Sequence, residues 1–219
     1  MGSLLDSTLN TRFIQAGGKP SVTVRSEQID ACPKSDIERL YALGVRAVID
    51  LRRLKDEIPN PYLSECGIEY FNVPIDDIDF DLSAFIDSTG AGDDEFRRNE
   101  AIGDFYYYSF KTLYRKEMIR ALKIYNRYDG HILIHCMWGK DRTAMISYLI
   151  QRHLKATDEE IFDGYLQSAV NLQPAFAEKK DCPTIEKSTA IFKRAEALCR
   201  PEPHLFDEFD LVLMNHITE

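Results

Sequence analysis

The sequence predicts an α/β fold in which helices flank a largely parallel central sheet. Two observations support this prediction. Short segments rich in β-branched residues, at 45–51, 70–73 and 132–135, have the length of strands and are separated by segments with helical patterns. The segment 132–135, Ile-Leu-Ile-His, is almost entirely apolar, which is typical of a strand covered on both faces. Because the 219 residues contain no repeat and no linker rich in Pro, Gly or Ser, one domain over 1–219 is expected.

The helices are indicated by their start and stop signals. The sequence Ser-Asp-Ile-Glu at 35–38 is a capping box, and Gly44 suits the position just beyond the end of that helix. Thr-Asp-Glu-Glu at 157–160 is a second capping box, which opens a helix through Gln167. Acidic residues and a Ser-Thr-Gly-Ala-Gly run at 76–95 predict an irregular, mobile connection. The remaining helices are expected over 96–127, 142–153, 187–199 and 204–215.

The composition limits the classes of partner. Lys and Arg number 27 against 36 Asp and Glu, a net charge of −9, which does not favour non-specific nucleic-acid binding. No apolar run approaches the ~18 residues of a membrane span, and the opening residues lack the basic and apolar parts of a secretory signal. The five cysteines are odd in number and never spaced as CxxC, so a reducing compartment is expected. We therefore expect a cytoplasmic protein without integral membrane association, nucleic-acid partner, metal or cofactor.

The segment 132–150, ILIHCMWGKDRTAMISYLI, is the most informative part of the chain. A buried strand runs into a short loop, and an apolar helix follows, so a helix N-terminus faces the carboxyl end of the sheet and can bind an anion. The loop between Cys136 and Arg142 is long enough to wrap its amides around a tetrahedral oxyanion, with Arg142 closing the cradle through a bidentate contact. Gly139 permits a turn with positive φ. The same electropositive field favours the thiolate form of Cys136, a nucleophile for attack on phosphorus.

A family resemblance adds to this interpretation. Residues 135–143, His-Cys-Met-Trp-Gly-Lys-Asp-Arg-Thr, match the HCxxGKDRT signature of the cysteine-dependent tyrosine phosphatases and are most similar to the PtpB-like branch of atypical bacterial and fungal enzymes. The sequence departs from that branch at Phe13 and Gly164, each in place of an Asp, and at Ala144 in place of a Gly, while the helix from His204 lies outside the resemblance. The resemblance extends to residues 10–18, 25–26, 43–52 and 157–168.

The resemblance implies a fold like that of the tyrosine and dual-specificity phosphatases and a loop that holds the substrate phosphate. It also suggests the general acid, because residues 72–77 resemble the strand-to-loop segment that carries this Asp in dual-specificity phosphatases. Asp77 is then the first candidate and Asp76 the second, while Asp141, within the loop itself, competes for the role. The residues expected to bind the phosphate are Met137, Trp138, Gly139, Lys140, Asp141, Arg142 and Thr143.

Individual side chains have further expected roles. Lys140 adds positive charge and would favour substrates with more than one phosphate. Thr143 either donates a hydrogen bond to the thiolate or caps the helix. His135 is expected to orient the loop from the end of the strand, without transferring protons. Asp50 and Arg52 are expected to brace the edge of the sheet.

The leading hypothesis is a metal-independent phosphatase that hydrolyses phosphate monoesters through a phosphocysteine intermediate. Its substrate would be phosphotyrosine, phosphoserine or phosphothreonine, a phosphoinositide or an inositol phosphate. Two alternatives stay open. A sulfurtransferase or arsenate reductase would also place a thiolate in an anion-binding loop, and a catalytically idle module would bind phosphate without turnover. The sequence leaves the oligomeric state open.

Overall fold

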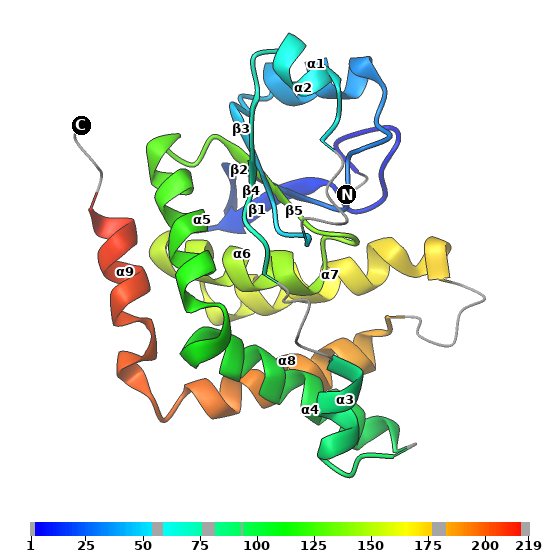
Figure 1. The fold of residues 1–219 in the computed structure, drawn as a ribbon, viewed down its shortest axis with the longest axis vertical. Coiled ribbons are helices and arrows are strands. Elements are labelled where there is room, and N and C mark those ends of the chain that lie inside the picture. Colours follow the sequence, from blue (N-terminus) through cyan, green and yellow to red (C-terminus); the bar gives the residue numbers. More distant parts are fainter. Residues whose placement is uncertain (1–2, 54–58, 76–81, 93, 177–182, 216–219) are drawn as a thin grey trace.

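The computed structural model describes residues 3–53, 59–75, 82–92, 94–176 and 183–215. Within them, a five-stranded sheet has the order β1-β2-β5-β3-β4 and lies at the centre of the molecule (Figure 1). Strands β2, β5, β3 and β4 are parallel, and β1 pairs with β2 in the antiparallel direction. The predicted α/β class and largely parallel sheet are therefore confirmed. The strands are β1 (Arg12–Ala16), β2 (Lys19–Ser26), β3 (Ala47–Asp50), β4 (Glu69–Asn72) and β5 (Ile132–His135).

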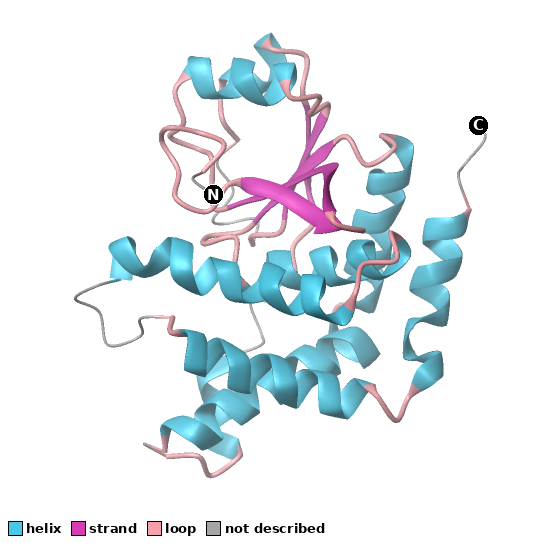
Figure 2. Cartoon of the chain, turned by 180° about the vertical axis from the view of Figure 1, so that it is seen from behind, coloured by secondary structure: helices cyan, strands magenta, loops and turns pink. Residues whose placement is uncertain are grey.

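Helices cover both faces of the sheet. Helices α1 (Lys34–Ala42) and α2 (Tyr62–Glu65) lie together on one side, and the larger group lies on the other, as Figures 1 and 2 show. Within the larger group, α8 packs against α4 and α7, and α9 packs against α5. Its members are α3 (Leu82–Ser88), α4 (Glu95–Tyr108), α5 (Arg115–Arg127), α6 (Asp141–His153), α7 (Asp158–Phe176), α8 (Ile185–Cys199) and α9 (Asp207–Met214).

Alternation along the strands separates two apolar cores. Leu133 of β5 packs into the core beneath α1 and α2. Its neighbours Ile132 and Ile134 pack into the larger core on the opposite face. Successive side chains of a strand point to opposite faces, so a four-residue strand that is apolar throughout is buried on both sides. This arrangement fixes β5 at the centre of the sheet and positions the loop that follows it.

The N-terminal hairpin was not predicted from the sequence. Strands β1 and β2 are joined by Gly17 and Gly18, which both have positive φ values, 65° and 74°. A two-residue Gly-Gly connection between strands is a hairpin signal. Both strands contain polar and charged residues, which obscure the alternating pattern of a strand. Two of these residues, Arg12 and Arg25, make hydrogen bonds to residues that are far away in the sequence.

The single helix predicted over 96–127 is wrong. Helix α4 ends at Tyr108, a π-helical turn spans Ser109–Leu113, and α5 begins at Arg115. Tyr114, at the break, has φ −123° and ψ 22°, outside the helical region. The break lets both Phe110 and Tyr114 enter the core, where Phe110 packs edge-on against the ring of Phe206 from the C-terminal part of the chain. Burial of aromatic side chains thus outweighs continuity of the helix.

Two further predictions need correction. The first helix begins at Lys34 with Pro33 as its N-cap, so Ser35 does not form the expected capping box. The buried carboxylate of Asp36 instead accepts a hydrogen bond from the backbone of Ser7. In the segment predicted to be irregular, residues 76–81 lie outside the described residues, but α3 follows them as a helix. Helix α3 is held by Ile86, which packs against Ala91 and Ala101 in a small apolar cluster.

Most other helix predictions are confirmed. Gly44 follows the end of α1 with φ 99°. The second capping box forms, since the Glu160 amide donates to Thr157 Oγ1 and the Thr157 amide donates to the Glu160 carboxylate. Helix α7 continues nine residues past the predicted end at Gln167, to Phe176. The last helix begins at Asp207, after a 3₁₀ turn over Pro203–Phe206.

Candidate active site

The loop after β5 lies at the carboxyl end of the parallel strands. Strand β5 pairs with β2 on one side and β3 on the other, and only five residues separate the end of the strand from the start of α6. Cys136, the first residue of the loop, is 3% exposed. The loop therefore delivers a buried thiol between the ends of three strands and against the N-terminus of an apolar helix.

The carbonyls of the second and third loop residues are held by the N-terminal part of the chain. The Gln28 amide donates to the carbonyl of Met137 at 3.1 Å. The side-chain amide of the fully buried Asn10 donates to the carbonyl of Trp138 at 2.9 Å and contacts that of Gly139 at 3.3 Å. These donors draw the carbonyls of the loop towards the hairpin.

The next two loop carbonyls are held by Arg25, which is 3% exposed. Its Nη2 donates to the carbonyl of Gly139 at 2.9 Å and to that of Lys140 at 3.3 Å. Its Nη1 donates to the carbonyl of Gly164 on α7 at 3.3 Å. Because the last contact uses a backbone oxygen, it does not depend on the side chain at position 164. Burial lowers the pKa of Arg25 to about 10, and Cys136 is the largest opposing influence.

The orientation of the carbonyls determines the orientation of the loop amides. In a trans peptide the C=O and the following N–H point in opposite directions. Four consecutive carbonyls, from Met137 to Lys140, have donors supplied by the N-terminal segment. The amides of residues 138–141 therefore point to the other side of the loop. Consecutive amides on one side of a loop can form an anion-binding concavity.

Gly139 is required by both conformation and space. Its φ is 64°, in the left-handed region, and a Cβ built on it would lie 2.3 Å from the backbone of Ser26. No side chain fits there unless β2 moves. The predicted need for positive φ at this position is confirmed, and the close approach of β2 adds a second reason.

Asp141 and Lys140 form a polar cluster with two tyrosines. Lys140 Nζ lies 2.5 Å from Asp141 Oδ1, which also accepts hydrogen bonds from the hydroxyls of Tyr106 and, at 3.4 Å, Tyr165. Burial raises the pKa of Asp141, but the combined effect of Lys140, the Tyr106 hydroxyl and Arg142 is larger, so that the pKa lies below its usual range. Asp141 is thus held as a carboxylate.

Arg142 and Thr143 lie in the first turn of α6. Arg142 Nη1 contacts the carbonyl of Leu51, just beyond β3, at 3.5 Å. Thr143 is fully buried, and its Oγ1 makes no hydrogen bond with any described residue, Cys136 included. Lys140 is the N-cap of α6, so Thr143 does not cap the helix. A buried hydroxyl without a partner is able to donate to a thiolate or a bound anion.

His135 and Asp50 support the loop from the sheet. His135 Nδ1 lies 3.3 Å from the carbonyl of Cys136, and its Nε2 lies 3.7 Å from Asp50 Oδ2. Burial lowers the pKa of His135, against the opposing effect of Asp50. Arg52, only 1% exposed, pairs with Asp50 and Asp30 at 2.6 Å each. This geometry agrees with the bracing roles expected for Asp50, Arg52 and His135.

Trp138 reaches from the loop to the end of α7. Its side chain packs edge-on against Phe176, with 4.6 Å between ring centroids, and Trp138 is 38% exposed.

The general-acid candidates Asp76 and Asp77 lie outside the described residues. Asn10 and Arg25 were not predicted as site residues, and the only signal for them in the sequence was the family resemblance of the segments that contain them.

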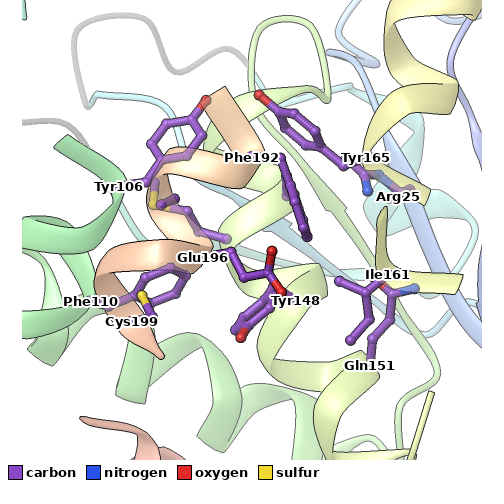
Figure 3. A pocket seen from close by; sticks show the side chains of 13 residues that line it. Arg25, Tyr106, Phe110, Tyr148, Gln151, Ile161, Tyr165, Phe192, Glu196 and Cys199 are labelled. Carbon is purple, nitrogen blue, oxygen red and sulfur yellow. The ribbon is translucent and has the colours of Figure 1, made fainter. Parts of the chain in front are cut away.

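A cavity of about 50 Å³ lies behind the loop, and the rings of Tyr106, Tyr165 and Phe192 stand around it (Figure 3). Arg25 also lines it, whereas Cys136 is not among the described residues of its wall. The volume suits one or two waters rather than a substrate. The cavity therefore backs the residues that hold Asp141 and the loop.

Within the described residues, no group of three or more His, Cys, Asp or Glu side chains is arranged to hold a metal ion. No helix in this part of the chain is both long and apolar enough to cross a membrane. The four described cysteines, Cys32, Cys66, Cys136 and Cys199, are free thiols.

A largely parallel sheet whose central strand leads to a buried cysteine, followed by an arginine on a helix, is the arrangement expected of a cysteine-dependent tyrosine phosphatase. Residues 14–211 match the model of the tyrosine phosphatase family, and the chain belongs to this family. The match includes most of α9, which the sequence resemblance did not reach.

One curated protein and two solved structures are similar to this chain. A tyrosine-protein phosphatase from Nostoc commune is 28% identical over 160 residues, covering 68% of this chain and 49% of that protein. The chain thus spans about half the length of this curated relative. The Siw14 catalytic core covers 91% of this chain and 96% of its own, with 17% identity and a TM-score of 0.50. A second structure is the core catalytic domain of the PP-IP phosphatase SIW14 from S. cerevisiae in complex with citrate. It has 16% identity and a TM-score of 0.44, and the match covers 89% of this chain and 94% of that one.

Proposed function

We propose that this protein is a metal-independent phosphatase that hydrolyses phosphate monoesters through a phosphocysteine intermediate. One observation carries the proposal: the carbonyls of residues 137–140 accept hydrogen bonds from Asn10, Arg25 and Gln28, which leaves the amides that follow them free to face a bound anion on the opposite side of the loop. Amides that are fixed before the substrate arrives stabilise charge on the equatorial oxygens of phosphorus without reorganisation. Membership of the tyrosine phosphatase family supports the same conclusion.

The reaction has two steps. The Cys136 thiolate attacks phosphorus, an S–P bond forms, and the ester P–O bond breaks as the leaving oxygen takes a proton from the general acid. Arg142 and the loop amides hold the phosphoryl oxygens. Water then attacks phosphorus, gives its proton to the same group, and the S–P bond breaks to release phosphate and regenerate the thiolate. The unpartnered hydroxyl of Thr143 is available to stabilise the departing thiolate.

We assign the general acid to Asp77, with Asp76 as the second candidate. Asp141 is a poor acid in this structure because its pKa lies below the usual range, and an acid must carry a proton when it meets the leaving group. Its contacts with Lys140 and Tyr106 suit a group that stays ionised and anchors the loop.

A nucleophilic thiolate needs a reducing environment, since it is readily oxidised. The free thiols of the described cysteines fit such an environment, and we place the protein in the cytoplasm. The proposed substrates are phosphoproteins, with dual specificity for phosphotyrosine and phosphoserine or phosphothreonine included, or phosphorylated lipids and inositols.

The experiment that tests this function measures phosphate release in the presence of a chelator. The substrates are a phosphotyrosine peptide, the matching phosphoserine peptide, phosphoinositides and inositol phosphates. Cys136→Ser is expected to abolish turnover, while Cys66→Ser, at a half-buried free thiol beyond α2, serves as the matched control and keeps it. Asp77→Asn is expected to lower kcat by roughly 10²–10⁴-fold, the usual contribution of a general acid, and Asp141→Asn by less.

Three results would replace this proposal. Loss of turnover with chelator would indicate a metal-dependent reaction. Phosphate binding without turnover of any substrate would favour a binding module. Sulfur transfer from thiosulfate or turnover of arsenate, with no release of phosphate, would assign the thiolate to one of the other two enzyme classes.

A further inference from the structure

Helix α5 carries a row of positive charges on the side that faces away from the core. Lys116, Arg120, Lys123 and Arg127 are all exposed, and their spacing of four, three and four residues places them in one line along the helix. The buried side chains of α5, such as Met118, lie on the opposite side. We call these four basic residues the cationic stripe.

The described part of the chain does not neutralise the cationic stripe. Its first three members make no hydrogen bond or ion pair with any described residue, and the fourth, Arg127, lies over the ring of Tyr128, 5.5 Å from its centre. The one acidic residue of α5, Glu117, is half-buried and lies outside the line of the stripe. A chain with a net charge of −9 thus gathers unpaired positive charge on one helix face.

Helix α9 lies beside α5 and extends the same outer surface (Figure 1). Arg115 at the start of α5 pairs with Glu208 at 2.7 Å, and Asn126 near its end donates to the carbonyl of Val212 at 2.6 Å. The two helices therefore run side by side in the same direction. Both bury their apolar side chains in the larger core, so their solvent-facing sides form one surface.

On this surface α9 exposes two large apolar side chains. Leu211 is 55% exposed and Met214, three residues later, is 64% exposed. The three acidic side chains of α9 each contact a basic side chain, at distances of 2.7–3.6 Å, so they do not offset the stripe. The cationic stripe, with Leu211 and Met214 beside it, is called the α5–α9 face.

The chemistry of the α5–α9 face favours a lipid surface over other polyanions. Basic side chains are attracted to anionic headgroups, and exposed apolar side chains enter the boundary between headgroups and acyl chains. A single-stranded nucleic acid is held by cations together with aromatic platforms for its bases, whereas the exposed apolar side chains here are Leu211 and Met214, which have no ring.

We propose that the α5–α9 face docks the protein on a membrane surface that contains anionic phospholipids. The cationic stripe lies at the phosphate headgroups, and Leu211 and Met214 enter the boundary with the acyl chains. Docking of this kind is peripheral, since it uses the outer sides of two helices and no membrane span. It requires no residue of the phosphate loop, so it stands or fails apart from the proposed phosphatase function.

The test is co-sedimentation of the protein with vesicles of phosphatidylcholine and phosphatidylserine, and with vesicles of phosphatidylcholine alone. Binding is expected only to the first, and added salt should weaken it. Arg120→Gln together with Lys123→Gln is expected to weaken binding roughly twentyfold, since each basic residue near an anionic surface contributes about fivefold. Leu211→Gln is expected to weaken it roughly threefold at low and high salt alike.

The matched control is Lys19→Gln together with Lys193→Gln, which removes two exposed cations of β2 and α8. It changes the net charge equally, and binding should change by less than about twofold. Unfolding midpoints that match wild type show that each variant is folded. Equal binding to both kinds of vesicle, or equal losses in the two double variants, would overturn the proposal. Binding to RNA or to an acidic peptide without binding to vesicles would also overturn it and assign the stripe to that partner.

Discussion

The guanidinium of Arg25 donates to the carbonyl of Gly139 across 114 residues of sequence. This contact joins the end of β2 to the turn of the phosphate loop, at the glycine whose missing Cβ lets the two backbones approach. In the proposed mechanism the N-terminal hairpin supports the active site even though it supplies no reacting group. By holding the loop carbonyls it would set the direction of the loop amides, on which the proposed stabilisation of the phosphoryl oxygens depends.

Arg25→Lys is expected to reduce activity without unfolding the protein. A lysine has no fork to reach Gly139, Lys140 and Gly164 together, and hydrogen bonds from a charged group contribute about 1.5–3 kcal/mol each. We expect kcat/KM to fall roughly ten- to a hundredfold, measured with an aryl phosphate. Arg200→Lys, at an exposed arginine, is the control. Unchanged kcat/KM in Arg25→Lys would contradict the role of the hairpin.

Gly139→Ala tests the close approach of β2 to the loop. Positive φ alone costs an alanine of order 1 kcal/mol, and the clash with the Ser26 backbone adds to this cost. We expect the free energy of unfolding to fall by at least about 2 kcal/mol and phosphate release to be nearly abolished. Gly90→Ala isolates the first effect, because Gly90 has φ 71° and open space around it. Equal losses of stability in the two variants would show that the clash is relieved without cost.

Arg52→Met is expected to be strongly destabilising, because it leaves the buried carboxylate of Asp50 without the guanidinium that balances its charge. Breaking one side of a buried ion pair costs about 3–5 kcal/mol. The measurement is urea-induced unfolding of both proteins at neutral pH. Lys34→Met removes an exposed pair with Glu65 and should change stability little. A small effect of Arg52→Met would mean that water or a rearranged side chain replaces the guanidinium.

The pH dependence of stability is expected to report on Asp141. Its folded pKa is lower than normal, because Lys140, the Tyr106 hydroxyl and Arg142 together outweigh the effect of burial. A lowered carboxyl pKa contributes stability above the ordinary Asp value of about 3.9, and this contribution is lost as the pH falls through the folded pKa. Asp141→Asn should therefore be less stable than wild type at pH 7, with a difference that shrinks below about pH 4. Unfolding midpoints at several pH values measure this, and a pH-independent difference would refute it.

The local parts of the site could be predicted from the sequence. Strand β5, the loop from Cys136 to Arg142 and the start of α6 are consecutive in the chain, and their apolar pattern, glycine and helix signal all lie within a short window. The capping box of Thr157 and Glu160 is predictable for the same reason, since its hydrogen bonds join residues three apart.

The tertiary structure decided those features that depend on contacts between residues far apart in the sequence. Asn10 and Arg25 acquire their roles only when the hairpin packs beside β5, and Phe176 reaches Trp138 only because α7 extends nine residues beyond the end that its local pattern indicates. The break at Tyr114 arises in the same way, because core packing near Phe206 outweighs helix propensity. The sequence by itself determined the nucleophile and its loop, since their chemistry is local. The direction of the loop amides and the contact between Trp138 and Phe176 depend on packing between residues that are far apart in the sequence. A short stretch of sequence does not include both partners of such contacts, so it cannot predict them.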